Sequence, residues 1–142
     1  MEKKRPRDKS WEDYGISKHR YNELKSFCLQ YKEKQEKIQY GLSAYNMDGN
    51  GGGAGPSDPT STSALIHAIY KKDIDMIEHS AVEANPDIYL YILKSVTEDK
   101  SYEEIEYDEQ YGRIPCGKTD FYAYRRLFFS ILNQKKDRLN YR

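Results

Sequence analysis

Residues 85–97 read NPDIYLYILKSVT and place many apolar and aromatic side chains in one short span. Pro86 lacks the backbone donor that a helix interior needs, and it disfavours helical geometry in the residue before it. It therefore ends one helix and suits the first turn of the next. We expect a helix from Asp87 to about Thr97 at the centre of the core, which carries these apolar and aromatic residues: Ile88, Tyr89, Ile92, Leu93 and Val96.

Helical periodicity continues on both sides of this stretch. Before it, a broad apolar stripe predicts a helix from about Ser63 to Ala84. After it, Ser101 and Glu104 have the spacing of a capping box, which predicts a short helix. A last helix is expected over residues 118–133. The sequence therefore predicts an all-α fold whose compact helical domain, residues 64–142, ends in a helix-turn-helix.

The N-terminal part divides into three segments. Residues 1–16 are polar and basic and predict a flexible arm, and residues 47–63 form a Gly/Ser/Pro linker. Between them, Ser17 is a good N-cap for a helix over 17–46, whose apolar residues recur at alternating spacings of three and four. This pattern predicts a dimerising helix, and packing on the same chain is an equal alternative. The candidate oligomerisation residues are Tyr21, Leu24, Cys28, Tyr31 and Ile38.

Charge is unevenly distributed along the 142 residues, although 23 Lys and Arg balance 23 Asp and Glu. Residues 1–39 hold 11 basic and 7 acidic residues, for a net +4, and residues 112–142 hold 8 and 2, for +6. Residues 73–111 hold 2 basic and 12 acidic residues, for a net charge of −10. The balance argues against a general nucleic-acid coat and leaves room for a local basic face. The acidic segment is interpreted as a solvated surface that repels phosphate.

Several function classes are excluded by what the sequence lacks. It has no long apolar run, so we expect no membrane span or signal peptide and a soluble cytosolic protein. Cys28 and Cys116 form no disulfide framework, and three scattered histidines have no metal-ligand spacing. Acidic residues abound without a neighbouring base or apolar pocket. We therefore expect no enzyme activity, no cofactor and no metal.

One stretch matches a phosphate-binding pattern literally. Residues 112–119, GRIPCGKT, satisfy GxxxxGK[ST], in which backbone N–H groups and a lysine hold phosphates. The preceding acidic stretch would make a poor buried parallel strand, and the chain after Thr119 is too short for a sheet. We interpret the glycine and proline as turn residues, and leave open whether Lys118 meets a phosphate.

The short helix after Ser101 and the last helix together predict a DNA-binding helix-turn-helix. The N-terminal part of the second helix would enter the major groove, where Arg, Thr and Tyr side chains reach bases and phosphates. The connection between the helices, about nine residues, exceeds the three or four of the standard motif. The candidate DNA-binding residues are Arg113, Lys118, Thr119, Tyr122, Arg125, Arg126, Lys135 and Lys136.

The segment CGKTDFYAYRRLFFSIL, residues 116–132, and the glycine-rich linker resemble the RinA/ArpU-type late-gene transcriptional regulators of phages and prophages of Gram-positive bacteria. The C-terminal half of that family is similar to region 4 of sigma factors. The resemblance implies binding to double-stranded DNA at late-gene promoters and recruitment of host RNA polymerase, in the cytoplasm of the host bacterial cell. It places Thr119, Tyr122, Arg125 and Arg126 in the recognition helix.

Two other functions fit the same pattern. A small terminase-like DNA-packaging adaptor also joins a helix-turn-helix to an oligomerising helix, and it would form a ring of many subunits. A protein-binding inhibitor module would use the acidic 73–111 surface to bind a basic partner, without affinity for duplex DNA. A homodimer is the assembly expected of a regulator.

Overall fold

The computed structural model describes the backbone of residues 4–47 and 58–140. This part of the chain is mainly helical, as predicted, with one antiparallel pair of two-residue strands. In chain order the elements are η1 (a 3-10 helix, Pro6–Asp8), α1 (Lys18–Leu29), α2 (Tyr31–Met47), α3 (Asp58–Ala84), α4 (Tyr89–Glu98), α5 (Tyr102–Ile105), β1 (Tyr107–Asp108), β2 (Gly112–Arg113) and α6 (Lys118–Asn140).

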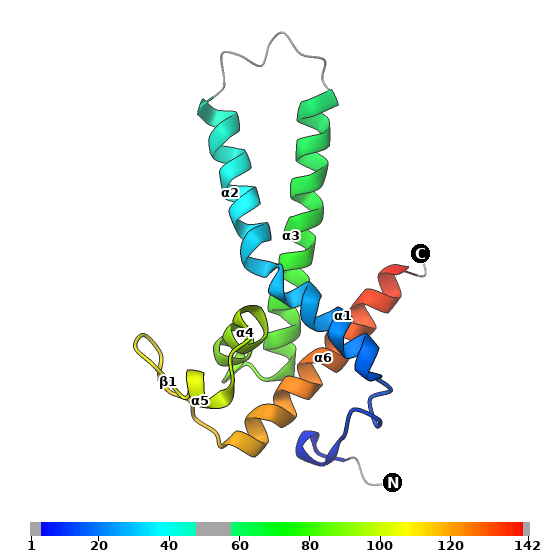
Figure 1. Cartoon of the computed structure of the whole chain (residues 1–142), viewed down its shortest axis with the longest axis vertical. Helices are drawn as coiled ribbons and strands as arrows, with labels where there is room; N and C mark the ends of the chain where they lie inside the picture. Colours follow the sequence, from blue (N-terminus) through cyan, green and yellow to red (C-terminus); the bar gives the residue numbers. More distant parts are fainter. Residues whose placement is uncertain (1–3, 48–57, 141–142) are drawn as a thin grey trace.

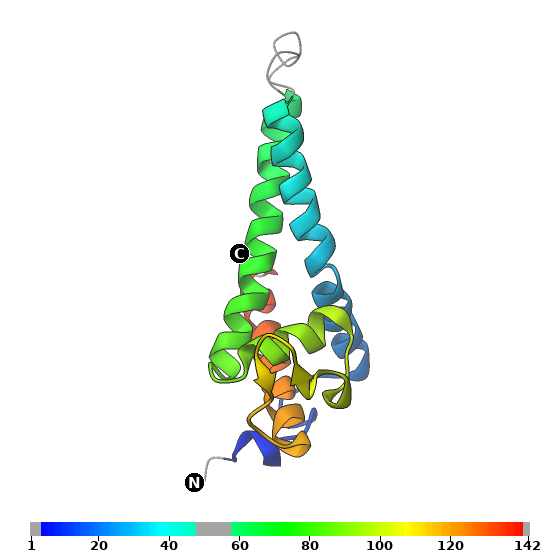
Figure 2. The same ribbon diagram turned by 90° about the vertical axis from the view of Figure 1, so that its left-hand side faces the viewer.

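The molecule consists of a helical hairpin that stands on a base (Figures 1 and 2). The helices α2 and α3 run side by side away from the base, and the second half of α3 continues into it. The base contains the N-terminal segment, α1, α4, α5, the two strands and α6. The β1–β2 hairpin projects from one side of the base, and the C-terminal half of α6 extends on the other.

Helix α4 lies in the core of the base, in agreement with its apolar sequence. It contacts α1, α3, α5 and α6, and its residues Ile92 and Val96 are almost fully buried. Three phenylalanines of α6, Phe121, Phe128 and Phe129, are fully buried in the same core. Since each Å² of apolar surface removed from water contributes about 25 cal/mol, these side chains are the main stabilising elements of the base.

The N-terminal segment 4–16 is part of the base, which differs from the flexible arm expected from its charge. Ile16 is buried, and the Trp11 ring lies 4.8 Å from Tyr21 and 6.0 Å from Phe129. The Tyr14 side chain also packs on the core, and its buried hydroxyl has no hydrogen-bond partner in the described part of the chain. These apolar side chains anchor the segment although most of its residues are polar.

The predicted helix over 17–46 is two helices. Ser17 caps α1 by accepting a hydrogen bond from the backbone N–H of Arg20, as its residue type predicts. The chain bends at Gln30, which lies between α1 and α2. The linker predicted over residues 47–63 ends earlier than expected, because residues 58–63 belong to α3, which begins at Asp58. Its residues 48–57 lie outside the described part of the chain.

The five residues predicted to mediate oligomerisation pack against other residues of the same chain. Leu24 and Cys28 are fully buried and Tyr31 is 8% exposed, all within the same core as α4 and α6. Tyr21 and Ile38 are partly buried against that core. The stripe therefore packs on the rest of its own chain, and the side chains of Leu24, Cys28 and Tyr31 are not available to a second copy in the folded protein.

Helices α5 and α6 are joined by residues 106–117, which contain the β1–β2 hairpin in place of a tight turn. The capping box of α5 is present, because Ser101 and Glu104 each accept a hydrogen bond from the other's backbone N–H. Gly112 has a φ of +81°, which favours glycine at the end of the hairpin loop. Helix α6 continues to Asn140, beyond the predicted end at residue 133.

Candidate nucleic-acid interface

The connection over residues 106–117, which precedes α6, is held in place by hydrogen bonds from side chains to its backbone. Asp108 accepts hydrogen bonds from the backbone N–H groups of Gln110 and Tyr111, at 2.7 and 2.9 Å. The hydroxyl of Tyr91 lies 3.0 and 2.9 Å from the carbonyl oxygens of Tyr111 and Gly112. Because Tyr91 belongs to the core helix α4, these contacts attach the hairpin to the base and set where α6 begins.

Arg125 connects three helices inside the base. Its Nε donates to the Ser95 hydroxyl of α4 at 3.1 Å, and a terminal guanidinium nitrogen donates to the Tyr21 hydroxyl of α1 at 3.0 Å. The guanidinium also lies 5.1 Å from the centre of the Phe129 ring. The geometry therefore gives this predicted DNA-binding residue a structural role in the free protein.

Tyr122 and Arg126 are also engaged within the chain. The Tyr122 hydroxyl accepts a hydrogen bond from the backbone N–H of Tyr102 at 3.0 Å, which ties α6 to α5. The Arg126 Nε donates to the backbone carbonyl of Lys9 at 3.0 Å. Both side chains are half-buried, and the N-terminal segment covers part of the α6 face that was predicted to enter the major groove.

The first turn of α6 remains exposed. Thr119 and Lys118 are exposed at the N-terminus of the helix. Lys118 forms an ion pair with Glu103, and this contact raises the pKa of the lysine and lowers the pKa of the glutamate. Arg113 is exposed on β2 and lies 3.3 Å from a Glu106 oxygen. These three candidates are accessible, although two of them have acidic neighbours.

The last two candidates, Lys135 and Lys136, lie on the second half of α6. Lys135 forms a 2.8 Å ion pair with Glu83. The Lys136 Nζ lies 3.7 Å from the centre of the Phe27 ring, and burial lowers its pKa below the ordinary value. Packing on an aromatic ring makes Lys136 mainly an intrachain contact.

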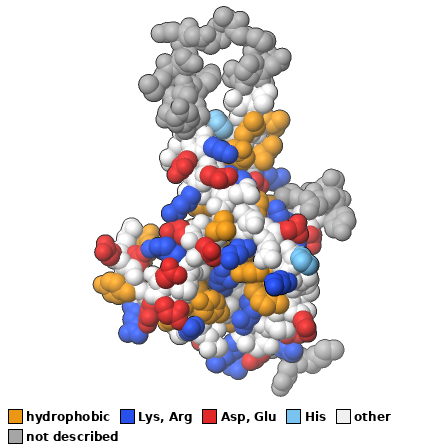
Figure 3. All heavy atoms as spheres, in the orientation of Figure 1, with side chains coloured by type: hydrophobic (Ala, Val, Ile, Leu, Met, Phe, Trp, Pro, Cys, Tyr) orange, Lys and Arg blue, Asp and Glu red, His pale blue; other side chains and the backbone are white. Residues whose placement is uncertain are grey.

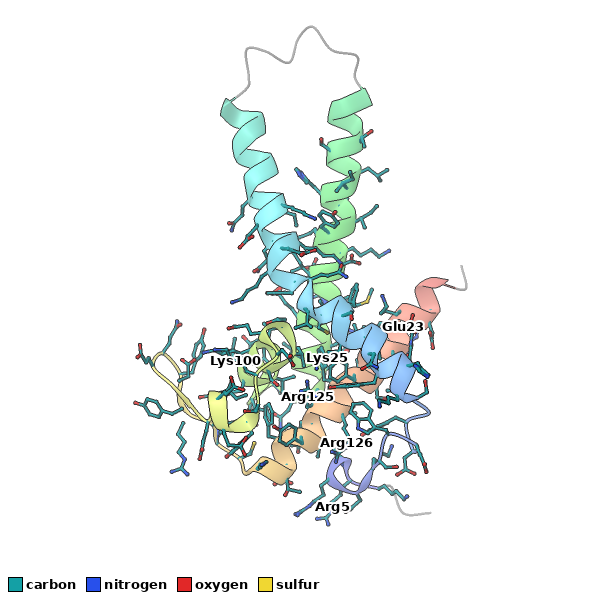
Figure 4. All side chains as sticks on the ribbon, viewed as in Figure 1. Arg5, Glu23, Lys25, Lys100, Arg125 and Arg126 are labelled. Carbon is teal, nitrogen blue, oxygen red and sulfur yellow. The ribbon has the colours of Figure 1, made fainter. Side chains whose placement is uncertain are left out.

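Basic residues from the predicted set and from outside it gather on one face of the base. Figure 4 labels Arg5, Lys25, Lys100, Arg125 and Arg126, which follow one another from the α4–α5 junction across α1 and α6 to the N-terminal segment. We call Arg5, Lys25, Lys100 and Arg126 the basic band and leave Arg125 out of it, because its guanidinium is engaged inside the base. Figure 3 shows Lys and Arg side chains along the middle and lower part of the same face.

Acidic residues lie beside the basic band at both ends. Lys25 pairs with Asp99 at 3.2 Å, and Lys100 lies 3.8 Å from Glu98. At the other end, the Arg5 Nε lies 3.3 Å from an Asp8 oxygen, and the Arg5 side chain is 73% exposed. Arg5, Lys25 and Lys100 are not among the residues predicted from the sequence, although the net charge of +4 over residues 1–39 was a signal for Arg5 and Lys25.

The GRIPCGKT segment does not have the structure of a nucleotide-binding loop. Gly112 and Arg113 form a two-residue antiparallel strand, whereas that mechanism requires a parallel strand that leads into the loop. Lys118 is directed to Glu103. The segment therefore serves as the hairpin end and the entry to α6.

Other kinds of site are not seen in the described ranges 4–47 and 58–140. They contain no group of three or more His, Cys, Asp or Glu side chains placed to hold a metal ion. No described helix has both the length and the apolar character needed to cross a bilayer. A scan against protein-family models and searches of curated proteins and solved structures found no match for this chain.

Proposed function

We propose that this protein binds duplex DNA through its basic band and the exposed first turn of α6, as a transcriptional regulator of the phage type described above. One observation supports the proposal most. The two positively charged parts of the sequence, residues 1–39 and 112–142, pack against each other in the base through the contacts of η1 and α1 with α6. Charges that are far apart in the sequence thereby add on one surface, which is the electrostatic footprint of a nucleic-acid-binding protein.

The roles within this interface differ from those that the helix-turn-helix pattern predicts. Arg5 and Arg7, exposed on the N-terminal segment, are suited to contact phosphates, because they can neutralise charge without leaving an intrachain partner buried. Thr119 and Lys118 stand at the N-terminus of α6, where a helix end favours anionic groups. Tyr122 and Arg125 position α6 from inside.

A binding assay tests the proposal directly. Fluorescence anisotropy would measure the dissociation constant for duplex fragments from the protein's own genomic neighbourhood at about 50 mM and about 200 mM salt. If several phosphates are contacted, the affinity falls by about a hundredfold or more over this range. Absence of duplex binding at the lower salt concentration would contradict the proposal.

Substitutions on the N-terminal segment show which surface is used. The double variant Arg5→Ala/Arg7→Ala should weaken binding to cognate and scrambled duplexes alike. It should also reduce the slope of log affinity against log salt by about 0.9 for each phosphate that is no longer neutralised. Lys71→Ala is the matched control, since Lys71 is exposed on the α2–α3 hairpin, away from the base. An equal effect of both changes would remove the basic band from the interface.

Host RNA polymerase is the protein partner implied by the resemblance to late-gene regulators. A second candidate function, binding of a basic protein partner, has one specific feature in its favour. The projecting β1–β2 hairpin exposes Tyr107 by 72% and Tyr111 by 48% beside Glu106 and Glu109. Exposed tyrosines are frequent at protein interfaces. A module of this kind shows no salt-sensitive affinity for duplex DNA, so the same anisotropy assay separates the two functions.

A further inference from the structure

The outer half of the α2–α3 hairpin is almost free of charge. Residues 38–70 contain only two charged residues, Asp48 and Asp58, whereas the other 109 residues hold the remaining 44 of the chain's 46. The change occurs within α3 itself. From Lys71 onward this helix carries acidic and basic residues again, as a solvent-exposed helix usually does.

Apolar side chains stand on this uncharged part of α3. Leu65 is 62% exposed, Ile66 40% and Ile69 50%. Their spacing of one, three and four residues places them on neighbouring rows of one helix side. Figure 3 shows a hydrophobic patch in the region of the first half of α3. We call Leu65, Ile66 and Ile69 the tip face.

Two antiparallel helices cannot enclose a core by themselves, because each buries only one side against the other. Near the base, α3 is covered by α4 and α6, and its residues Ile74, Ile77 and Ala81 are buried. In the first half of α3, the exposed tip face lacks such a covering layer within the described part of the chain. In helix bundles, a third and a fourth helix complete such a layer.

We propose that the tip face binds the tip face of a second copy of this chain, so that two hairpins form a four-helix bundle. The charge pattern favours an uncharged partner surface, and a second copy of this chain offers one. Two uncharged surfaces meet without like-charge repulsion and without the desolvation of an ion, whereas a charged partner finds no opposite charge on residues 62–70. Because the hairpin projects from the base, the pairing also keeps the two highly charged bases apart.

The size of the tip face sets the strength of the pairing. Three partly exposed side chains offer less than the roughly 800 Å² per partner of a stable interface. The dimer therefore draws on adjoining turns of both hairpins, and we expect it to dissociate in the micromolar range.

Sedimentation velocity without DNA tests the proposal, and its result is independent of the DNA-binding function. The wild-type mass should rise with concentration from 16.7 kDa towards twice that value. Leu65→Glu should raise the dissociation constant of the dimer about tenfold or more, because a carboxylate would be buried without a partner. Leu65 is the most exposed residue of the tip face, so this change leaves the monomer fold intact.

Val82→Glu is the matched control, since Val82 is 40% exposed on the same helix but lies in its last turn. The control should dimerise as the wild type does, and thermal melts followed by circular dichroism should show all three proteins folded. A mass that stays monomeric at every concentration overturns the proposal and leaves the tip face to a different partner. A ring of many subunits, or an equal effect of Val82→Glu, overturns it as well.

Discussion

Arg125 is of a residue type that often contacts DNA, but its position in the fold gives it a structural role. It hydrogen-bonds to α4 and α1 and packs on Phe129 of its own helix. We expect Arg125→Ala to lower the free energy of unfolding by about 2–4 kcal/mol, because it leaves polar partners unsatisfied and removes packing.

Urea denaturation followed by circular dichroism measures this change. Arg5→Ala is the control, since its side chain is largely exposed, and it should change the unfolding free energy by less than about 0.5 kcal/mol. If Arg125→Ala were as stable as the control and weakened DNA binding alone, Arg125 would return to the set of direct contacts.

The buried thiol of Cys28 and the buried hydroxyl of Tyr31 make the stability of the fold depend on pH. Burial raises the pKa of Cys28 from 9.0 to about 12, and burial and Glu78 raise the pKa of Tyr31 from 10.0 to about 12. The unfolded chain loses these protons at lower pH than the folded protein does. Stability is therefore full below pH 9 and falls as pH rises from about 9 to 12.

Urea midpoints measured at several pH values across this range show the effect. Cys28→Ala should make the alkaline loss of stability less steep, because one of the two groups is removed. An identical pH dependence in the variant would mean that Cys28 does not contribute. The thiol of Cys116, which is less buried, should react with a thiol reagent before that of Cys28.

At the level of elements, the cap residues predicted the helix starts well. Ser17 and Ser101 begin α1 and α5 as expected, because a side-chain oxygen that satisfies a free backbone N–H is a local feature of the sequence. The bend at Gln30 carries no glycine or proline, so no local signal marks it. It depends on how α1 packs on α4 and α6 and α2 on α3, which is a property of the whole fold.

The sequence contains a signal for the start of α3, but the surrounding residues are typical of a linker. Asp58 and Pro59 stand in its first turn, where the missing N–H of proline breaks no hydrogen bond. The surrounding Ser, Thr and Gly residues favoured a linker instead. The β1–β2 hairpin was also missed, because strands of two residues are too short for a recognisable alternation of side chains.

Loss of an N-cap should lower the stability by about the contribution of one local hydrogen bond. Ser101→Ala removes the hydroxyl of the α5 capping box and should lower the unfolding free energy by about 1 kcal/mol. Ser26→Ala, on the exposed surface of α1, is the control and should leave stability unchanged or slightly raised. Equal urea midpoints for wild type and Ser101→Ala would show that packing alone holds α5.

At the level of the whole molecule, the charge pattern of the sequence predicted that a basic face exists, and the fold decides which residues form it. Helical periodicity placed Tyr122 and Arg126 on the outer side of α6. It could not show that Tyr122 would bond to α5, or that the N-terminal segment would lie against Arg126, a contact between residues 117 positions apart. The candidate site was therefore predicted in its charge and only in part in its residues.

Removal of residues 1–9 tests the contribution of the N-terminal segment to the interface. The truncated protein should stay folded, because Trp11 and Ile16 keep their places on the core. Its affinity for duplex DNA and the salt dependence of that affinity should both decrease, because Arg5, Arg7 and Lys9 are removed. A tighter complex after truncation would mean instead that the segment blocks α6.

Trp11, the single tryptophan of the chain, lies in the N-terminal segment and packs at a tilted angle against the rings of Tyr21 and Phe129. Its indole emission is therefore a built-in optical probe of whether the segment is seated. Lifting of the segment from α6 would bring the ring into water and shift the emission to longer wavelengths, whereas closer docking would leave the spectrum in place. The wild-type protein can thus be followed during complex formation without any attached dye.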